Sequence, residues 1–161
     1  MAGGPRFISG QQVGHQKGMT VIADRVIQEL SEDECLRLIS PGGVGRIAYT
    51  GRFGPAVLPV NYRMADGAIV FRTAEHGALD EDLRTGIEAA DYRVAFEIDE
   101  IDEAGRLGWS VLLVGPAHHV TDAERTGLGE ASGVVPWAPG DRELFVRIVP
   151  SRITGRRITP A

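Results

Sequence analysis

Apolar and polar positions alternate along most of the chain, and this pattern predicts short β-strands. In Tyr92–Ile101 the side chains of Val94, Phe96 and Ile98 fall on one face, and small or acidic side chains fall on the other. The same alternation, broken by turn residues, predicts further strands at Val44–Thr50, Ala56–Met64, Ala68–Thr73, Trp109–Thr121, Leu144–Val149 and Ile153–Ile158. Short strands joined mostly by tight turns are typical of a small antiparallel barrel, because closure removes exposed sheet edges.

Turns and prolines refine this prediction. Gly51–Pro55 and Ala65-Asp66-Gly67 fit tight turns, so the strands around them form an antiparallel meander. Pro59 lies inside a predicted strand and cannot donate a ladder hydrogen bond, so the strand is at a sheet edge or bulged there. Such a site leaves backbone groups free for a ligand or only protects the edge, and both interpretations stay open. Gly115-Pro116 predicts a bulge or bend that lets the sheet curl.

A few short helices accompany the strands. Ser31 and Glu34 form a capping box, with Ser at the N-cap and Glu three positions later. Cys35 follows on the apolar face of this helix, where a lone cysteine is expected to be a small core residue. The predicted helices run from the capping box to about Ser40, from Gly77 to Gly86, and from Asp122 to Glu130 with Asp122 as the cap.

Length and composition place the chain among globular proteins. It has 161 residues and 17.3 kDa, enough for one domain with a core, and 43% of its residues are apolar. Residues 1–19 lack periodicity and are expected to form a flexible arm, with residues 20–161 as the single domain. Within that domain, Thr20–Leu30 fits either a strand or a helix.

Charge and residue usage exclude several partners. A net charge of -5 gives no help to nonspecific binding of nucleic acid or of an anionic membrane. No apolar run approaches the roughly 20 residues that cross a bilayer. The single cysteine cannot form an internal disulfide, which fits the reducing cytoplasm.

Candidate chemistry is limited by what the chain lacks. Lys17 is the only lysine, which argues against a pyridoxal phosphate Schiff base, and no Walker A loop is present. The acidic run Asp99–Glu103 has no convergent histidine and is expected to be a solvated turn, so no metal site is predicted. His118 and His119 are adjacent on a strand, face opposite ways and cannot share a metal; exposed strand polarity explains them.

One stretch does predict a ligand. A strand ends in Arg72 and Thr73, and a turn containing Gly77 follows before the next predicted helix. A guanidinium, a hydroxyl and backbone N–H groups at such a turn make a plausible anion pocket, and phosphate is the commonest biological anion that fits one.

With these residues in view, four segments resemble the flavin-binding split-barrel superfamily, which includes the pyridoxamine 5'-phosphate oxidases. The likeness is closest to small actinobacterial members and to proteins of the nitroimidazole-resistance type, and it covers most of residues 31–158 in family order. The segments are VGRIAYTGRFGPAVLPVNY (44–62), IVFRTAEHG (69–77), RVAFEIDEIDEAGRLGWSVLLVGPAHHV (93–120) and RIVPSRITGRRI (147–158).

The resemblance implies a six-stranded antiparallel split β-barrel, mainly β with small helices. It also implies a homodimer with FMN in each of two clefts between the subunits. The residues that it assigns to the flavin are Pro59, Val60 and Asn61 along the ring, Arg72, Thr73 and His76 around the phosphate, and Trp109 and Ser110 at the start of the long strand. Arg156 and Arg157 resemble the closing strand of the family, and on adjacent positions they face opposite ways.

The chain departs from the family in the turn after Thr73. The family usually has a Ser or Thr and then a cation there, whereas this chain has acidic residues at Glu75 and at Asp80-Glu81-Asp82. Loss of a charge-assisted phosphate contact of about 1.5–3 kcal/mol lowers affinity by one to two decades. Carboxylates would weaken binding further unless they point outward.

The function implied is that of an FMN-dependent oxidoreductase acting on an unidentified small planar substrate stacked on the flavin ring. No residue is singled out as a proton donor, and activity on pyridoxamine phosphate is not expected because a second phosphate site is not evident. The alternatives are a deazaflavin-dependent reductase, which the acidic segment disfavours, a non-catalytic flavin- or haem-binding carrier, and a cofactor-free dimeric barrel.

Overall fold

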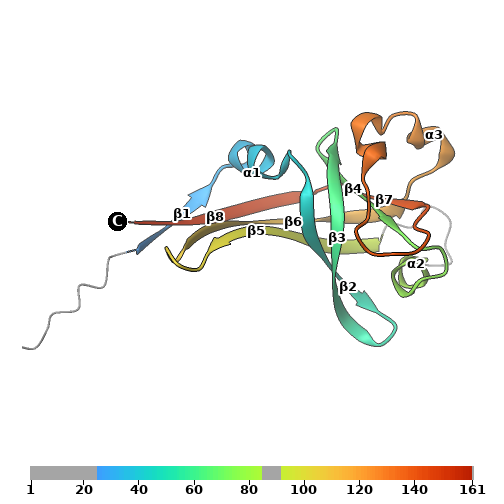
Figure 1. The fold of residues 1–161 in the computed structure, drawn as a ribbon, viewed down its shortest axis with the longest axis horizontal. Helices are drawn as coiled ribbons and strands as arrows, with labels where there is room; N and C mark the ends of the chain where they lie inside the picture. The colour runs from blue at the N-terminus through green and yellow to red at the C-terminus, as the bar shows by residue number, and fades with distance from the viewer. Residues whose placement is uncertain (1–24, 85–91, 161) are drawn as a thin grey trace, which may run out of the picture.

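The computed structural model describes residues 25–84 and 92–160 (Figure 1). The expected arm at residues 1–19 and the end of the helix expected at Gly77–Gly86 lie outside these ranges. The strands are β1 Arg25–Leu30, β2 Gly43–Gly51, β3 Gly54–Ala65, β4 Ala68–Thr73, β5 Tyr92–Asp102, β6 Leu107–His119, β7 Leu144–Ile148 and β8 Arg152–Pro160. The helices are α1 Glu32–Ile39, α2 Ala78–Leu83, α3 Asp122–Arg125 and the 3-10 helix η1 Gly129–Gly133.

Six of the strands close into an antiparallel barrel. The strand order is β1-β8-β6-β5-β2-β3-β4-β7, and an additional pairing of β6 with β7 closes the ring from β6 through β5, β2, β3 and β4 to β7. The expected split barrel is therefore confirmed. The described part of the ambiguous segment before α1 is strand β1, which lies outside the ring on β8.

The barrel splits at Gly115, where β6 changes partners. β8 pairs with β6 up to Val114, and β7 pairs with it from Ala117 onward. Between them, Val149 N–H donates to the Pro116 carbonyl at 3.0 Å. A Cβ on Gly115 would lie 2.0 Å from the Val149 carbonyl oxygen, so only glycine permits this approach. The bend expected at Gly115-Pro116 is therefore the point on β6 where pairing changes from β8 to β7, the two strands that flank Pro150.

Beyond the split, part of the sheet extends away from the barrel. This part, called the wing here, consists of β1, β8, residues 107–114 of β6 and residues 98–102 of β5; it runs to the left in Figure 1. Helix α1 covers one face of it, and Cys35 packs so closely on Gly155 that a Cβ there would meet the sulfur at 2.5 Å. Cys35 is fully buried, as expected of a core residue, and burial raises the pKa of its thiol.

The barrel interior and an outer patch form two apolar clusters. Phe71 and Phe96 stack inside the barrel, and Tyr62 meets the Phe96 ring edge-on. The second cluster lies outside β4, where η1 and Leu128 cover Val70. Alternate residues of β4 therefore face two different cores, which explains why Ala68–Phe71 is buried throughout.

Helix ends agree with the sequence at α1 and differ at α3. Both hydrogen bonds of the Ser31–Glu34 capping box are present. Asp122, the expected cap of the later helix, is instead its first residue, because Thr121 and Glu124 form a second capping box. None of the helices in the described ranges is long and apolar enough to cross a membrane.

Candidate functional site

The edge of β3 is open along the segment that contains Pro59. β3 pairs with β2 from Gly54 to Tyr62 but with β4 only from Tyr62 to Ala65. Within the described ranges, residues 54–61 therefore have a strand neighbour on one side only. Of the two alternatives inferred from Pro59, a sheet edge or a bulge, the structure has the edge, and the register with β2 runs unbroken through Pro59. Pro59 is exposed, and Val60 is partly buried against the barrel core.

Asn61 ends this open edge and holds a loop. Its side-chain Oδ1 accepts a hydrogen bond of 2.8 Å from the backbone N–H of Trp137. Trp137 belongs to the loop between η1 and β7, and its side chain is 80% exposed. The loop thus lies beside the candidate flavin edge.

Arg72 and Thr73 point to opposite faces of β4. Thr73 lies on the face of Phe71 and is buried. Arg72 lies on the other face, where its Nε donates to the Arg142 carbonyl at 2.6 Å and its Nη2 lies 2.8 Å from Glu143 Oε1. Since the Glu143 side chain is 73% exposed, this ion pair is solvated and weak.

The turn after Thr73 uses its own amide groups. His76 has a left-handed backbone, with φ 58°, and its N–H donates to Asp80 Oδ2 at 2.7 Å. Gly77 N–H donates to the Ala74 carbonyl at 3.3 Å. The His76 side chain is exposed and lies 3.8 Å from Glu75. An anion at this turn would therefore depend on side chains more than on these two amides.

The acidic segment of the turn is neutralised by cations. Asp80 is fully buried and accepts from Arg84 Nε at 2.9 Å. Burial by itself would raise the pKa of Asp80, but the hydrogen bonds from Arg84 and the His76 N–H outweigh it, and the pKa is lowered. Glu81 and Asp82 both pair with Arg52 from the β2–β3 turn. These three carboxylates therefore oppose a phosphate less than the sequence suggested.

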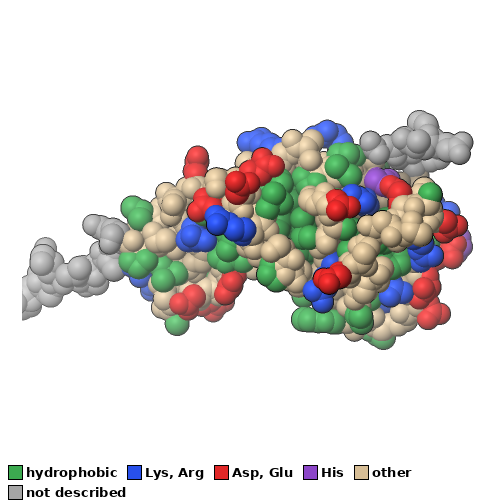
Figure 2. Space-filling model, turned by 90° about the horizontal axis from the view of Figure 1, so that it is seen from above, with side chains coloured by type: hydrophobic (Ala, Val, Ile, Leu, Met, Phe, Trp, Pro, Cys, Tyr) green, Lys and Arg blue, Asp and Glu red, His purple; other side chains and the backbone are tan. Residues whose placement is uncertain are grey.

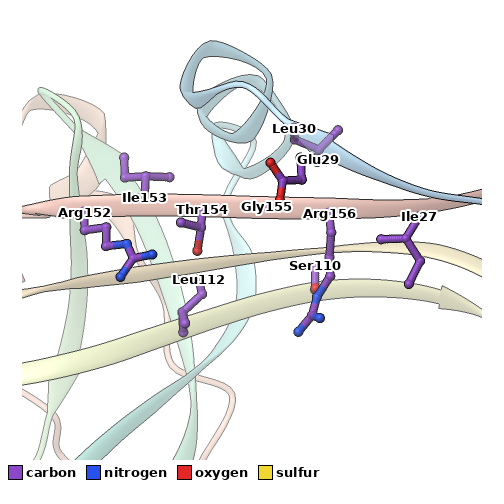
Figure 3. A pocket seen from close by; sticks show the side chains of 10 residues that line it. All are labelled: Ile27, Glu29, Leu30, Ser110, Leu112, Arg152, Ile153, Thr154, Gly155 and Arg156. Atoms are coloured by element: carbon purple, nitrogen blue, oxygen red, sulfur yellow. The ribbon is translucent and has the colours of Figure 1, made fainter.

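Trp109 and Ser110 lie on the wing. Trp109 Nε1 donates to Glu100 at 3.1 Å. Ser110 lies between Asp99 and Arg156 in the sheet register, in a groove of about 500 Å³ over β8 and β6. Figure 3 shows Ser110, Arg156 and neighbouring side chains extending to the same side of these strands. Arg156 is exposed and Arg157 half-buried, in agreement with their expected opposite orientations.

Within a single copy of the chain, some of the residues assigned to the flavin lie together and others lie far apart. Pro59, Val60 and Asn61 form one open edge, and the strand end with Arg72 and Thr73 follows β3 across a tight turn. Trp109 and Ser110 lie on the wing, at the opposite end of the molecule from α2 (Figure 1).

Sequence reasoning missed the loop that touches both ends of the first group. The contacts of Arg142 and Glu143 with Arg72, and of Trp137 with Asn61, join the loop to β3 and β4. The available signal was a tryptophan between Pro136 and Pro139, a large aromatic side chain in a proline-containing loop.

The two adjacent histidines face opposite ways, as expected, but exposed polarity does not describe them. His118 Nε2 lies 3.0 Å from Glu124, and His119 Nε2 lies 2.8 Å from Asp80. Across the described residues, no group of three or more His, Cys, Asp and Glu side chains is placed to hold a metal ion.

Comparison with known proteins places these features in a family. The family model for pyridoxamine 5'-phosphate oxidase matches residues 31–157. An uncharacterized protein of Mycobacterium tuberculosis, Rv0080, is 34% identical over 134 residues, 83% of this chain and 87% of the relative. The resemblance inferred from the sequence is thereby confirmed.

Two solved structures share the fold. A Corynebacterium glutamicum protein assigned to the pyridoxamine 5'-phosphate oxidases superposes with a TM-score of 0.65 at 30% identity, over 84% of this chain and 95% of that one. An FAD-binding protein of Mycobacterium smegmatis superposes with a TM-score of 0.60 at 31% identity, over 82% and 98%.

Proposed function

Because the chain belongs to the pyridoxamine 5'-phosphate oxidase family, we propose that it binds a flavin along the open edge of β3 and serves as an oxidoreductase. The observation that carries this proposal is the side of residues 54–61 that has no strand partner among the described residues and that ends beside Arg72 and Thr73. A flat ring can receive hydrogen bonds from such an edge, and a phosphate can receive them from the Arg72 guanidinium, whereas the Thr73 hydroxyl lies on the opposite, buried face of β4.

The donors at the site fit a flavin phosphate. Arg72 has an exposed partner, Glu143, that a phosphate can displace, since a solvated ion pair contributes only about 0–1 kcal/mol. Pairing of Asp80 with Arg84, and of Glu81 with Arg52, removes part of the repulsion. A bound flavin would supply the redox chemistry, while Arg72 and the β3 edge would bind and orient it and the buried Thr73 would pack the end of β4 behind Arg72.

A second copy of the chain completes the site in this proposal. Ile27, Ile158, Gly108 and Ile101 stand side by side across the four strands of the wing, and the three isoleucines are exposed. Figure 2 shows apolar side chains at the end of the wing among charges of both signs. An exposed apolar row of this kind favours association. A homodimer would bring the Trp109 and Ser110 of one subunit to the β3 edge of the other.

The leading cofactor is FMN, with FAD second because the Mycobacterium smegmatis relative is an FAD-binding protein. A deazaflavin with an acidic tail is the third candidate, and paired carboxylates at Asp80–Asp82 argue against it less than unpaired ones would. The substrate is a small planar molecule, and the cytoplasm is the expected location.

The proposal is tested by titrating the purified protein with FMN, FAD and riboflavin while recording flavin fluorescence. We expect saturable FMN binding, and Arg72→Ala should raise the Kd for FMN about 10- to 100-fold because a charge-assisted contact is lost. Riboflavin, which lacks the phosphate, should bind both forms equally. Arg37→Ala, which removes the same charge from the exposed face of α1, is the control. No binding of any flavin would refute the proposal.

Two further measurements separate enzyme from carrier and dimer from monomer. Loss of the visible flavin absorbance with a nicotinamide donor supports an oxidoreductase, and a flavin that no donor reduces supports a carrier. Sedimentation should show a dimer, and Ile158→Asp on the wing should lower dimerisation and flavin affinity together. A variant that stays monomeric and still binds flavin normally would contradict the shared site.

A further inference from the structure

A small groove lies next to β3 at Asn61–Arg63, just past the residue that ends the open edge. Its walls are the α1–β2 turn at Pro41, residues Asn61–Arg63 of β3, and the loop that carries Trp137. Its volume is about 250 Å³. Drug-sized ligand pockets usually measure about 300–1,000 Å³, so this groove is suited to a single small ring.

The aromatic wall of the groove is held in place without being buried. Trp137 is 80% exposed, yet its backbone N–H is anchored on Asn61 Oδ1. The other end of the same loop is anchored by the contacts of Arg142 and Glu143 with Arg72. These contacts anchor the backbone that carries the indole, and its exposed aromatic face offers a surface on which a planar ring can stack.

The polar side of the groove is cationic. Arg63 is exposed and donates one N–H to the Pro41 carbonyl at 3.1 Å, which holds its guanidinium across the α1–β2 turn. None of the side chains lining the groove, all within the described ranges, carries a carboxylate. Arg63 is the one charged side chain among these lining residues, and Glu130 borders only the adjoining groove that Arg63 also lines. Asn61 adds an amide N–H₂ that can also donate.

We propose that this groove binds a planar aromatic carboxylate. The ring stacks on the Trp137 indole, and the carboxylate accepts hydrogen bonds from Arg63 and from the amide of Asn61. Binding by itself does not need a flavin. The role of the groove as the substrate subsite rests on the proposed function, because Asn61 links it to the β3 edge where the flavin ring would lie.

The two tryptophans of the chain make a direct test possible. Protein labelled with ¹⁵N has two indole N–H signals, from Trp109 on the wing and from Trp137, and Trp137→Phe assigns them. The probes are benzoate, benzamide, which is neutral, and cyclohexanecarboxylate, which has no aromatic ring. We expect benzoate to shift the Trp137 signal saturably and to leave the Trp109 signal in place.

Two substitutions separate stacking from charge. Trp137→Ala should weaken benzoate binding at least about tenfold, whereas Trp137→Phe keeps an aromatic face and retains most of it. Arg63→Gln should weaken benzoate about tenfold and leave benzamide unchanged. With these variants, binding is followed through the backbone N–H signals of Asn61 and of its neighbour Tyr62, which are present in all of them.

Several outcomes would overturn the proposal. They are a Trp137 signal that does not move with benzoate, equal binding of cyclohexanecarboxylate, or a shift that follows protein concentration and so marks self-association. Running the titration with and without FMN keeps the two proposals distinct. A protein that binds benzoate but no flavin refutes only the proposed function, and one that binds flavin but not benzoate refutes only this inference.

Discussion

The fully buried carboxylate of Asp80 lies 2.8 Å from Nε2 of His119, and this contact joins helix α2 to the end of β6. The same carboxylate holds the left-handed His76 through its backbone N–H and pairs with Arg84, the residue that follows α2. One acidic side chain therefore fixes the path of the chain next to the candidate phosphate site.

Asp80→Ala should lower the free energy of unfolding by about 1–3 kcal/mol, because the partners lose a buried acceptor. Asp80→Asn keeps an oxygen acceptor and should recover part of the loss. Urea unfolding measures both, with Glu103→Ala on an exposed turn as the control. Equal stability of all three variants would show that the buried contacts contribute nothing net.

The free energy of unfolding should depend on pH through Glu124. Hydrogen bonds from the Thr121 backbone N–H and from His118 lower the pKa of Glu124 from 4.5 to about 2. Because the folded-state value is the lower one, the stabilisation is fully present above about pH 4.5 and is lost as the pH falls toward 2. The difference in unfolding free energy between wild type and Glu124→Gln should therefore shrink over this range.

Urea unfolding from neutral pH down to about pH 2 measures that difference, with the exposed Glu130→Gln as the matched control. A difference that stays constant down to the lowest pH would contradict the assignment to Glu124.

Gly115→Ala should destabilise the protein by about 1–3 kcal/mol or more, because the new Cβ would meet the Val149 carbonyl oxygen at 2.0 Å and backbone must shift. Gly133→Ala, whose Cβ would meet nothing within 4 Å, should change stability little. Thermal unfolding compares the two substitutions, and similar Tm values would mean that the split of the barrel tolerates a side chain.

Glu143→Gln should tighten FMN binding by a few-fold, up to about fivefold, because Arg72 no longer has a competing carboxylate. Riboflavin affinity should not change, since riboflavin has no phosphate for Arg72 to meet. Fluorescence titration of both ligands measures the effect. A weaker FMN complex in this variant would instead mean that Glu143 orients Arg72 for the phosphate.

Features that depend only on neighbouring residues could be predicted from the amino-acid sequence. The capping box of Ser31 and Glu34, the turn at Asp66-Gly67 and the alternating faces of β5 follow from local geometry. Pro59 indicated a sheet edge because the missing N–H is a property of that residue alone. The order of these short elements predicted a small antiparallel barrel, and the family resemblance implied that it is a split one.

Which distant groups meet was settled by the closed barrel and not by any local pattern. Barrel closure places β7 and β8 end to end on β6, brings Arg52 to Glu81 and Asp82, and sets His119 against Asp80. The acidic turn therefore looked unpaired in the sequence although its cations come from other elements. The same holds for Asn61 and Trp137, since a hydrogen bond across the sheet edge has no local signature. Such contacts depend on the closed topology, which supplies the partners only after the strands have found their register.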